Sequence, residues 1–213
     1  MLDQLEVLDV RYHANPSTPK VRAAMSEGLI DCIITPKQGN RIPENAWICA
    51  DNGVFGKGYP GDEAWWAWLQ TIPTERCRFA VAPDVVGDAA ATLERSLPWL
   101  PKIREIGLPA AFVAQDGQES LPVPWDEFDV LFIGGSTEWK LGRHAREIVR
   151  EAKARGKWVH MGRVNSERRL RYADAIGCDS ADGTYLAFGP DVNLPDVLAW
   201  VRVVDHPTMW EMS

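Results

Sequence analysis

The chain has 213 residues, of which 46% are hydrophobic and 25% charged, and its net charge is −7. This length allows one substantial core and is too short for two, so we expect a single domain over residues 1–213. No apolar run approaches the ~20 residues that cross a bilayer, and the N-terminus lacks a signal-peptide pattern. We therefore expect a cytoplasmic protein without a membrane partner; for a phage-encoded chain, the cytoplasm would be that of the host.

Positive charge is concentrated in one stretch of this acidic chain. Between Lys140 and Arg171 there are eleven Lys or Arg and three Glu. Arg143, Arg146 and Arg150 recur at helical spacing, which is typical of a solvated amphipathic helix. The same concentration of charge is expected of a face that binds phosphates, so the stretch has two interpretations.

Neither the cysteines nor the histidines form a metal-binding pattern. Cys32, Cys49, Cys77 and Cys178 lie far apart without a CxxC pair, and three of them are inside apolar segments, so we expect buried free thiols. The four His residues show no HxH or HExxH spacing. The sequence therefore predicts no metal and no cofactor.

Short apolar runs rich in β-branched residues alternate with helix-patterned stretches, as parallel βα units require. Eight strands are predicted, at Leu5–Arg11, Leu29–Thr35, Ala46–Ala50, Arg78–Ala82, Ala110–Ala114, Val130–Ile133, Trp158–Met161 and Ile176–Cys178. Helices are predicted at Pro19–Glu27, Asp62–Leu69, Asp88–Ile106, Glu138–Ala154, Ser166–Ala175 and Pro195–Val203, with N-caps at Asp88 and Ser166. Eight such units predict a compact α/β fold, a (β/α)8 TIM-like barrel, and an open doubly wound sheet is the alternative.

Glycines and polar residues gather directly after six of the predicted strands. They are Asp51-Asn52-Gly53, Pro83-Asp84, Gln115-Asp116-Gly117, Gly134-Gly135-Ser136, Gly162-Arg163 and Asp179 to Gly183. In a parallel barrel these positions converge on the C-terminal mouth, where catalytic residues collect. Gly and Asp are also common in ordinary turns, and turn formation is a sufficient explanation for any one of these loops. It is a weaker explanation for the occurrence of such residues after six strands.

In chain order, these strand ends resemble the tRNA-guanine transglycosylase superfamily, and most closely its compact DNA-modifying relatives that insert 7-deazaguanine bases into DNA. The matching segments are ICADNGVFG, VAPDVVGD, FVAQDG, FIGGS, VHMGRV and GCDSADG. The resemblance extends roughly from Ile48 to Gly183. No single segment is specific, whereas six in the right order are considerably more so.

The resemblance implies that guanine in a polynucleotide is exchanged for a 7-deazaguanine derivative. Asp182 is the expected nucleophile, because a carboxylate can form a covalent glycosyl intermediate at the anomeric carbon. Asp51 is the expected second carboxylate, which carries protons to the leaving guanine and from the incoming base. Asp179 is the other acid of the last motif; it either supports Asp182 by hydrogen bonding or faces the neighbouring loop.

By the same resemblance, the base is recognised at the other strand ends. Asp84 is expected to accept from the N1–H and exocyclic amine of guanine, and Gln115 with the backbone amides of Gly134 and Gly135 to bind its carbonyl. Asn52 stands where the family has Ser, which bears on base specificity. Met161 is expected to cover one face of the ring. His160, its neighbour, is expected in the core or on the outer face of the barrel.

The chain also departs from the family pattern. The tRNA enzymes carry a Cys/His zinc site after the barrel, and no Cys follows Cys178, so we expect a barrel without the zinc subdomain. This favours DNA over tRNA as the partner. Arg163 and Arg168 are the expected phosphate contacts, and a homodimer or a partner subunit would supply the rest of the groove.

Two other functions remain open at this stage. A base-releasing N-glycosylase would keep the nucleophile and use water as the acceptor. A non-catalytic subunit that binds a deazapurine or a nucleic acid would bind the base without a covalent adduct.

Overall fold

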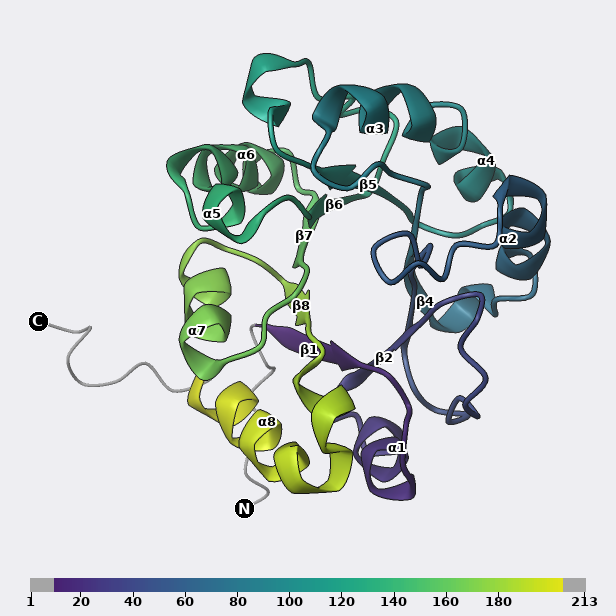
Figure 1. Ribbon diagram of the computed structural model, residues 1–213, viewed down its shortest axis with the longest axis vertical. Helices are drawn as coiled ribbons and strands as arrows, with labels where there is room; N and C mark the ends of the chain where they lie inside the picture. The colour runs from purple at the N-terminus through teal and green to yellow at the C-terminus, as the bar shows by residue number, and fades with distance from the viewer. Residues whose placement is uncertain (1–9, 205–213) are drawn as a thin grey trace, which may run out of the picture.

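The computed structural model describes residues 10–204, which form a closed barrel of eight parallel strands in chain order. The helices surround the barrel on its outside (Figure 1). The predicted (β/α)8 barrel is confirmed, and the closed ring excludes the open doubly wound sheet. Within residues 10–204, no helix has the length and apolar character needed to span a membrane.

The strands are short, and each pairs in parallel with its two neighbours. They are β1 (Arg11–Ala14), β2 (Asp31–Ile34), β3 (Ile48–Ala50), β4 (Cys77–Val81), β5 (Ala110–Ala114), β6 (Val130–Ile133), β7 (Trp158–Met161) and β8 (Ser180–Asp182). The barrel closes where β8 pairs with β1 and His13 lies opposite Asp182.

Two strand predictions differ from the structure. The first strand was predicted at Leu5–Arg11, whereas β1 extends from Arg11 to Ala14; residues 5–9 of that prediction lie outside the described part of the chain. The last was predicted at Ile176–Cys178, but Ile176 is the C-cap of a helix and Gly177 turns the chain with a φ of 95°. The apolar run therefore belongs to a turn, and the more polar segment Ser180–Asp182 forms β8.

The helices are α1 (Pro19–Ser26), α2 (Asp62–Leu69), α3 (Ala89–Ser96), α4 (Leu100–Glu105), α5 (Thr137–Lys140), α6 (Arg143–Ala154), α7 (Glu167–Ala175) and α8 (Pro190–Val204). Short 3-10 turns lie at Thr74–Arg76, Gln118–Ser120 and Tyr185–Phe188. Two helices predicted as continuous are each divided in two. Pro98 lies between α3 and α4, and Pro101 lies in the first turn of α4. Proline removes backbone donors and clashes with the preceding turn, so α3 cannot continue into α4. Gly142 separates α5 from α6.

Polar side chains begin four of these helices at their N-caps. The side chains of Thr18, Asp88, Ser136 and Ser166 each accept a backbone N–H from the first turn that follows. Each such cap satisfies a donor that has no partner within the helix. The predicted caps at Asp88 and Ser166 are confirmed.

The hydrophobic core has an outer and an inner layer. The outer layer lies between barrel and helices and includes Ile133, Val159 and Met161. The inner layer fills the barrel with side chains such as Phe79 and Phe132. All four cysteines are free and buried, as predicted.

Candidate active site

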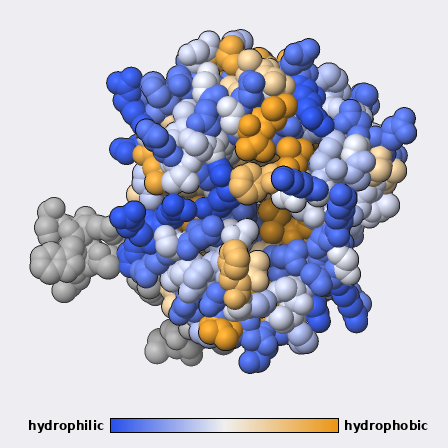
Figure 2. Space-filling model, in the orientation of Figure 1, coloured by the Kyte–Doolittle hydropathy of each residue, from blue (hydrophilic) through white to orange (hydrophobic). Residues whose placement is uncertain are grey.

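A pocket of about 440 Å³ opens at the C-terminal mouth of the barrel. Apolar side chains gather in a hollow near the centre of this face, with hydrophilic side chains around it (Figure 2). Of the predicted site residues, the pocket is lined by Asp51, Asn52, Asp84, Gln115 and Asp182, and also by Gly134, Gly135 and Arg163. The barrel thus brings together residues from six different strand ends.

Asp182 ends β8, and each of its two carboxylate oxygens has a hydrogen-bond partner. Its Oδ2 lies 3.0 Å from Nε2 of His160, and its Oδ1 accepts from the backbone N–H of Arg163 at 3.2 Å. The side chain is 16% exposed and lines the pocket. Asp182 is therefore a fixed, partly accessible carboxylate.

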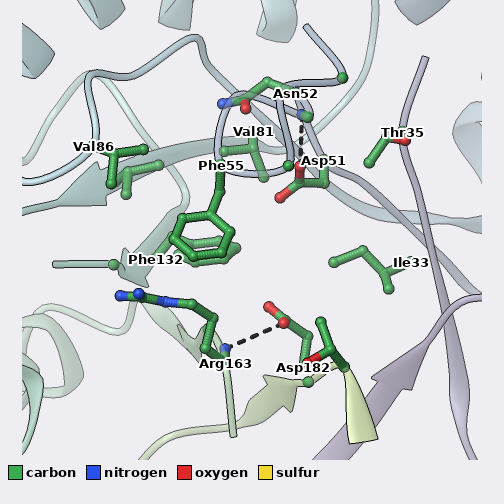
Figure 3. A pocket seen from close by; sticks show the side chains of 18 of the residues that line it. Ile33, Thr35, Asp51, Asn52, Phe55, Val81, Val86, Phe132, Arg163 and Asp182 are labelled. Atoms are coloured by element: carbon green, nitrogen blue, oxygen red, sulfur yellow. Dashed lines mark hydrogen bonds between the residues drawn. The ribbon is translucent and has the colours of Figure 1, made fainter. Parts of the chain in front are cut away.

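Asp51 follows β3 and faces Asp182 across the pocket. The two carboxylates project from opposite walls into one space, beside the side chains of Ile33 and Phe132 (Figure 3). One Asp51 oxygen accepts from the backbone N–H of Gly53 at 2.7 Å. The pKa of Asp51 is raised to about 7, mainly by burial and also by the charge of Asp182, against the lowering effect of that N–H. Asp51 can therefore exchange a proton near neutral pH.

Asp84, beyond the end of β4, is fixed by two side-chain amides. Asn52 donates to one of its oxygens at 2.9 Å, and Gln115 donates to the other at 2.6 Å. The amide oxygen of Gln115 in turn accepts from the backbone N–H groups of Gly87 and Gly135. Burial raises the pKa of Asp84 above its usual range, and the two amide donors oppose this effect. The network presents a rigid hydrogen-bonding edge to the pocket.

The glycine pair after β6 allows the backbone to approach other walls of the pocket. A Cβ on Gly134 would lie 2.7 Å from Val113, and one on Gly135 would lie 2.8 Å from the carboxylate of Asp116. Asp116 accepts from the backbone N–H and the hydroxyl of Ser136 and so fixes this loop. Side chains larger than hydrogen therefore do not fit here without movement.

Arg163 adopts an uncommon backbone conformation, with φ of 61°. This directs its N–H at Asp182, while its guanidinium donates to the carbonyl of Gly135 and lies 4.6 Å from the ring centre of Phe55. Lys140, which is buried, donates to the carbonyl of Gly162 just before it. Burial lowers the pKa of Lys140 to about 7. Non-glycine residues with positive φ persist only where the surroundings hold them, and they cluster at functional sites.

Four expectations about this region need correction or remain unresolved. The N–H groups of Gly134 and Gly135 donate to the carbonyl of Ala114 and to the amide oxygen of Gln115, so they are not free to bind a base carbonyl as predicted. Met161 is fully buried in the outer core layer and does not line the pocket, so the predicted contact with a base is wrong. Asp179 precedes β8 and binds Lys153 and the N–H of Val159 at the opposite end of the barrel, so neither role considered for it applies. Arg168 is exposed on α7, outside the pocket, and its contact with phosphate remains a prediction.

His160 was not predicted as a site residue. It points into the barrel, is fully buried, and contacts Asp182 from below the pocket. Side chains alternate across a strand, and Met161 points outward. The resemblance placed Met161 in the pocket, and by alternation this would turn His160 away from the pocket, so His160 was not considered as a site residue. Within residues 10–204, no group of three or more His, Cys, Asp or Glu side chains is arranged to hold a metal ion.

No protein-family model and no curated protein matches this sequence. Solved structures do match. One is tryptophan synthase from M. tuberculosis in an open form with BRD0059 bound, at 15% identity and a TM-score of 0.55, covering 93% of this chain and 92% of that one. A mutant tryptophan synthase alpha-subunit from Pyrococcus furiosus matches at 13% identity and a TM-score of 0.52, covering 92% and 94%. This chain spans 64% of another M. tuberculosis tryptophan synthase chain, matched with a TM-score of 0.49. At this level of identity the likeness shows the barrel fold alone.

Proposed function

We propose that this protein exchanges guanine in a polynucleotide for a 7-deazaguanine derivative, through a covalent intermediate on Asp182. The observation that carries the proposal is the pair of unlike carboxylates in one pocket. Asp182 accepts the backbone N–H of Arg163 and contacts Nε2 of His160, whereas burial raises the pKa of Asp51 to about 7. Two carboxyl groups in different environments are the usual arrangement for dividing nucleophilic and proton-transfer roles.

In the proposed first displacement, an oxygen of Asp182 forms a bond to the anomeric carbon of the sugar. The bond from that carbon to the guanine nitrogen breaks, its electron pair leaves with guanine, and guanine takes a proton from Asp51. In the second displacement, Asp51 accepts a proton from the incoming base, whose nitrogen attacks the anomeric carbon and releases Asp182. Both steps balance without a cofactor, and the sugar–phosphate backbone stays intact.

The Asp84 network supports a purine as the exchanged base. Its carboxylate can accept from an N1–H and an amine, and both of its oxygens are already oriented by Asn52 and Gln115. Apolar walls that include Val81 and Val113 would contact the ring faces. The pocket volume of about 440 Å³ is within the usual range for small-ligand sites. A base would reach the mouth only after leaving its stack, at a cost of a few kcal/mol.

The proposal can be tested with a labelled 7-deazaguanine base, incubated with the protein and either duplex DNA or tRNA, followed by mass analysis of the nucleosides. We expect label in DNA, and a protein–DNA adduct that survives denaturation. Asp182→Asn should abolish both, because it keeps the shape of the side chain and removes the anionic oxygen; the expected loss is roughly 10⁴- to 10⁶-fold.

Other outcomes would contradict the proposal in distinct ways. Abasic sites without incorporated label would indicate a base-releasing glycosylase. Tight base binding without an adduct would indicate a binding subunit. Label found only in tRNA would show that tRNA, and not DNA, is the substrate. Exchange by Asp182→Asn at close to the wild-type rate would remove Asp182 as the nucleophile.

A further inference from the structure

Beneath the pocket, four side chains form a continuous chain of hydrogen bonds inside the barrel. Nε1 of Trp158 lies 2.9 Å from Oγ of Ser180, and this Oγ lies 2.8 Å from Nδ1 of His160. Nε2 of His160 lies 3.0 Å from Oδ2 of Asp182. Ser180 and His160 are both fully buried, so water does not compete for these contacts.

The two ends of the chain determine its direction. The indole of Trp158 can only donate, so Ser180 accepts its N–H. An ionised Asp182 can only accept, so the proton of this contact is on Nε2 of His160. Nδ1 then accepts the one hydroxyl proton of Ser180. In this arrangement every proton of the four hydrogen-bonded side chains has an acceptor. If His160 were an imidazolium, Nδ1 would also donate, and the buried hydroxyl proton of Ser180 would have no acceptor among these four side chains.

Packing prevents His160 from adopting another orientation. Its ring lies against Phe132 and Phe79, with ring centres 4.6 and 5.1 Å away. The ring of His13 lies 5.1 Å away and is tilted against it. Both nitrogens of His13 are buried and make no hydrogen bond, so His13 does not compete for the nitrogens of His160. A ring turned by 180° about its Cβ–Cγ bond would present carbon atoms to Ser180 and Asp182 and lose both contacts.

We propose that His160 is a positioning residue for Asp182, held in the Nε2–H tautomer by Ser180 and Trp158. Its N–H engages one carboxylate oxygen while the backbone N–H of Arg163 engages the other. Together they fix the plane of the carboxylate toward the pocket. The same N–H stabilises the carboxylate as it is released in the second displacement. The effect on turnover rests on the proposed function, whereas the tautomer does not.

The tautomer is tested by long-range ¹⁵N–¹H NMR of the wild-type protein with labelled histidine between pH 6 and pH 8. We expect a protonated Nε2 and an unprotonated Nδ1 for His160. His144, half-exposed on α6 and 3.5 Å from Glu147 through its Nδ1, serves as an internal reference outside the barrel. Ser180→Ala should shift the Nδ1 signal because Nδ1 loses its donor, while the contact with Asp182 keeps the proton on Nε2. A protonated Nδ1 in the wild-type protein would overturn the proposal without reference to any activity.

The effect on turnover is tested with two substitutions of His160. His160→Gln can retain an N–H at the position of Nε2, and His160→Phe cannot. We expect His160→Phe to lower kcat about 10²-fold with little change in KM, since misplacing a reacting group costs about this much. The covalent adduct should persist for longer than in the wild-type protein.

His160→Gln should recover most of that loss. Wild-type kcat in a folded His160→Phe protein would overturn the positioning role. Absence of exchange in the wild-type protein would instead contradict the proposed function, and the NMR result would still decide the tautomer.

Discussion

The carboxylates at the two ends of the barrel have different partners. At the N-terminal end, Asp31 is paired with Arg78 and Arg11, and Asp179 with Lys153. At the mouth, Asp51, Asp84 and Asp182 accept hydrogen bonds from amides, backbone N–H groups and an imidazole. Within residues 10–204, none of these three carboxylates forms an ion pair with Lys or Arg.

The different partners indicate different roles: the carboxylates at the N-terminal end stabilise the fold, and those at the mouth are available for chemistry. Burial raises the pKa of Asp31 above its usual range, and the charges of Arg78 and Arg11 oppose this effect by favouring the ionised form. Neutral donors orient a carboxylate without cancelling its charge, so the charge of Asp182 remains available and raises the pKa of Asp51. Catalytic residues of such barrels lie at the C-terminal face, whereas residues at the other face serve stability.

The largest expected effect follows from replacing Asp51. Its pKa rises from the usual 3.8 to about 7 on folding, so the folded chain binds this proton more tightly than the unfolded chain. The resulting stability is fully present below about pH 4 and is lost as the pH rises to about 7. Asp51→Asn should therefore increase the free energy of unfolding by about 4 kcal/mol at pH 8 and by little at pH 4. Exchange should fall ~10²- to 10⁴-fold because proton transfer is lost.

Urea denaturation at both pH values checks the effect on stability. Asp116→Asn is the matched control. Burial acts to raise the pKa of Asp116, but the hydrogen bonds from Ser136 lower it overall, so its contribution is present at neutral pH and lost as the pH falls through the acid range. The two variants should thus shift stability in opposite directions at pH 8. Equal stability of Asp51→Asn and wild type at pH 8 would contradict the raised pKa.

The next effect concerns the N-terminal end. Arg78→Met leaves Asp31, which is 1% exposed, with Arg11 at 3.6 Å as its remaining cation. Breaking a buried ion pair typically costs 3 to 5 kcal/mol, and with Arg11 still present we expect about 3 kcal/mol at pH 7. Exchange per folded molecule should stay within about twofold of wild type. Adding Asp31→Asn to Arg78→Met should recover part of the lost stability. If Arg78→Met alone does not lower the free energy of unfolding, the pair of Arg78 and Asp31 does not stabilise the fold.

The smallest effect is expected at the partly exposed pair of Lys153 and Asp179. Its charged atoms are 2.6 Å apart, and the side chains are 39% and 23% exposed. Such pairs contribute at most about 1 kcal/mol. Lys153→Met should lower the free energy of unfolding by less than this, and the loss should shrink in 1 M salt as screening removes the attraction. A loss of several kcal/mol in the free energy of unfolding that does not depend on salt would show that Asp179 behaves as a buried ion-pair partner, like Asp31, and not as a surface residue.

The amino-acid sequence by itself determined the succession of strands and helices and the end of the barrel at which polar residues collect. The βα alternation predicted the closed fold, and the residues after β3, β4, β5 and β6 do line one pocket. These are local properties, since a buried parallel strand is a continuous apolar run and a strand end is marked by Gly and polar residues. The apolar run Ile176–Cys178 was misread because it packs as a turn in front of β8.

Only the tertiary structure decided which side chains of those strands face the pocket and what they contact there. Both faces of a barrel strand are buried, so alternation of polarity does not distinguish the interior from the helix side. Met161 on β7 was placed in the pocket incorrectly for this reason, and the choice for His160 between core and outer face stayed open. The place of Asp179 at the opposite end of the barrel from Asp182 followed only from the start of β8 at Ser180. The hydrogen bonds of Asp182 and the raised pKa of Asp51 arise between residues far apart in the chain. They depend on the register and closure of the barrel, which no local pattern encodes.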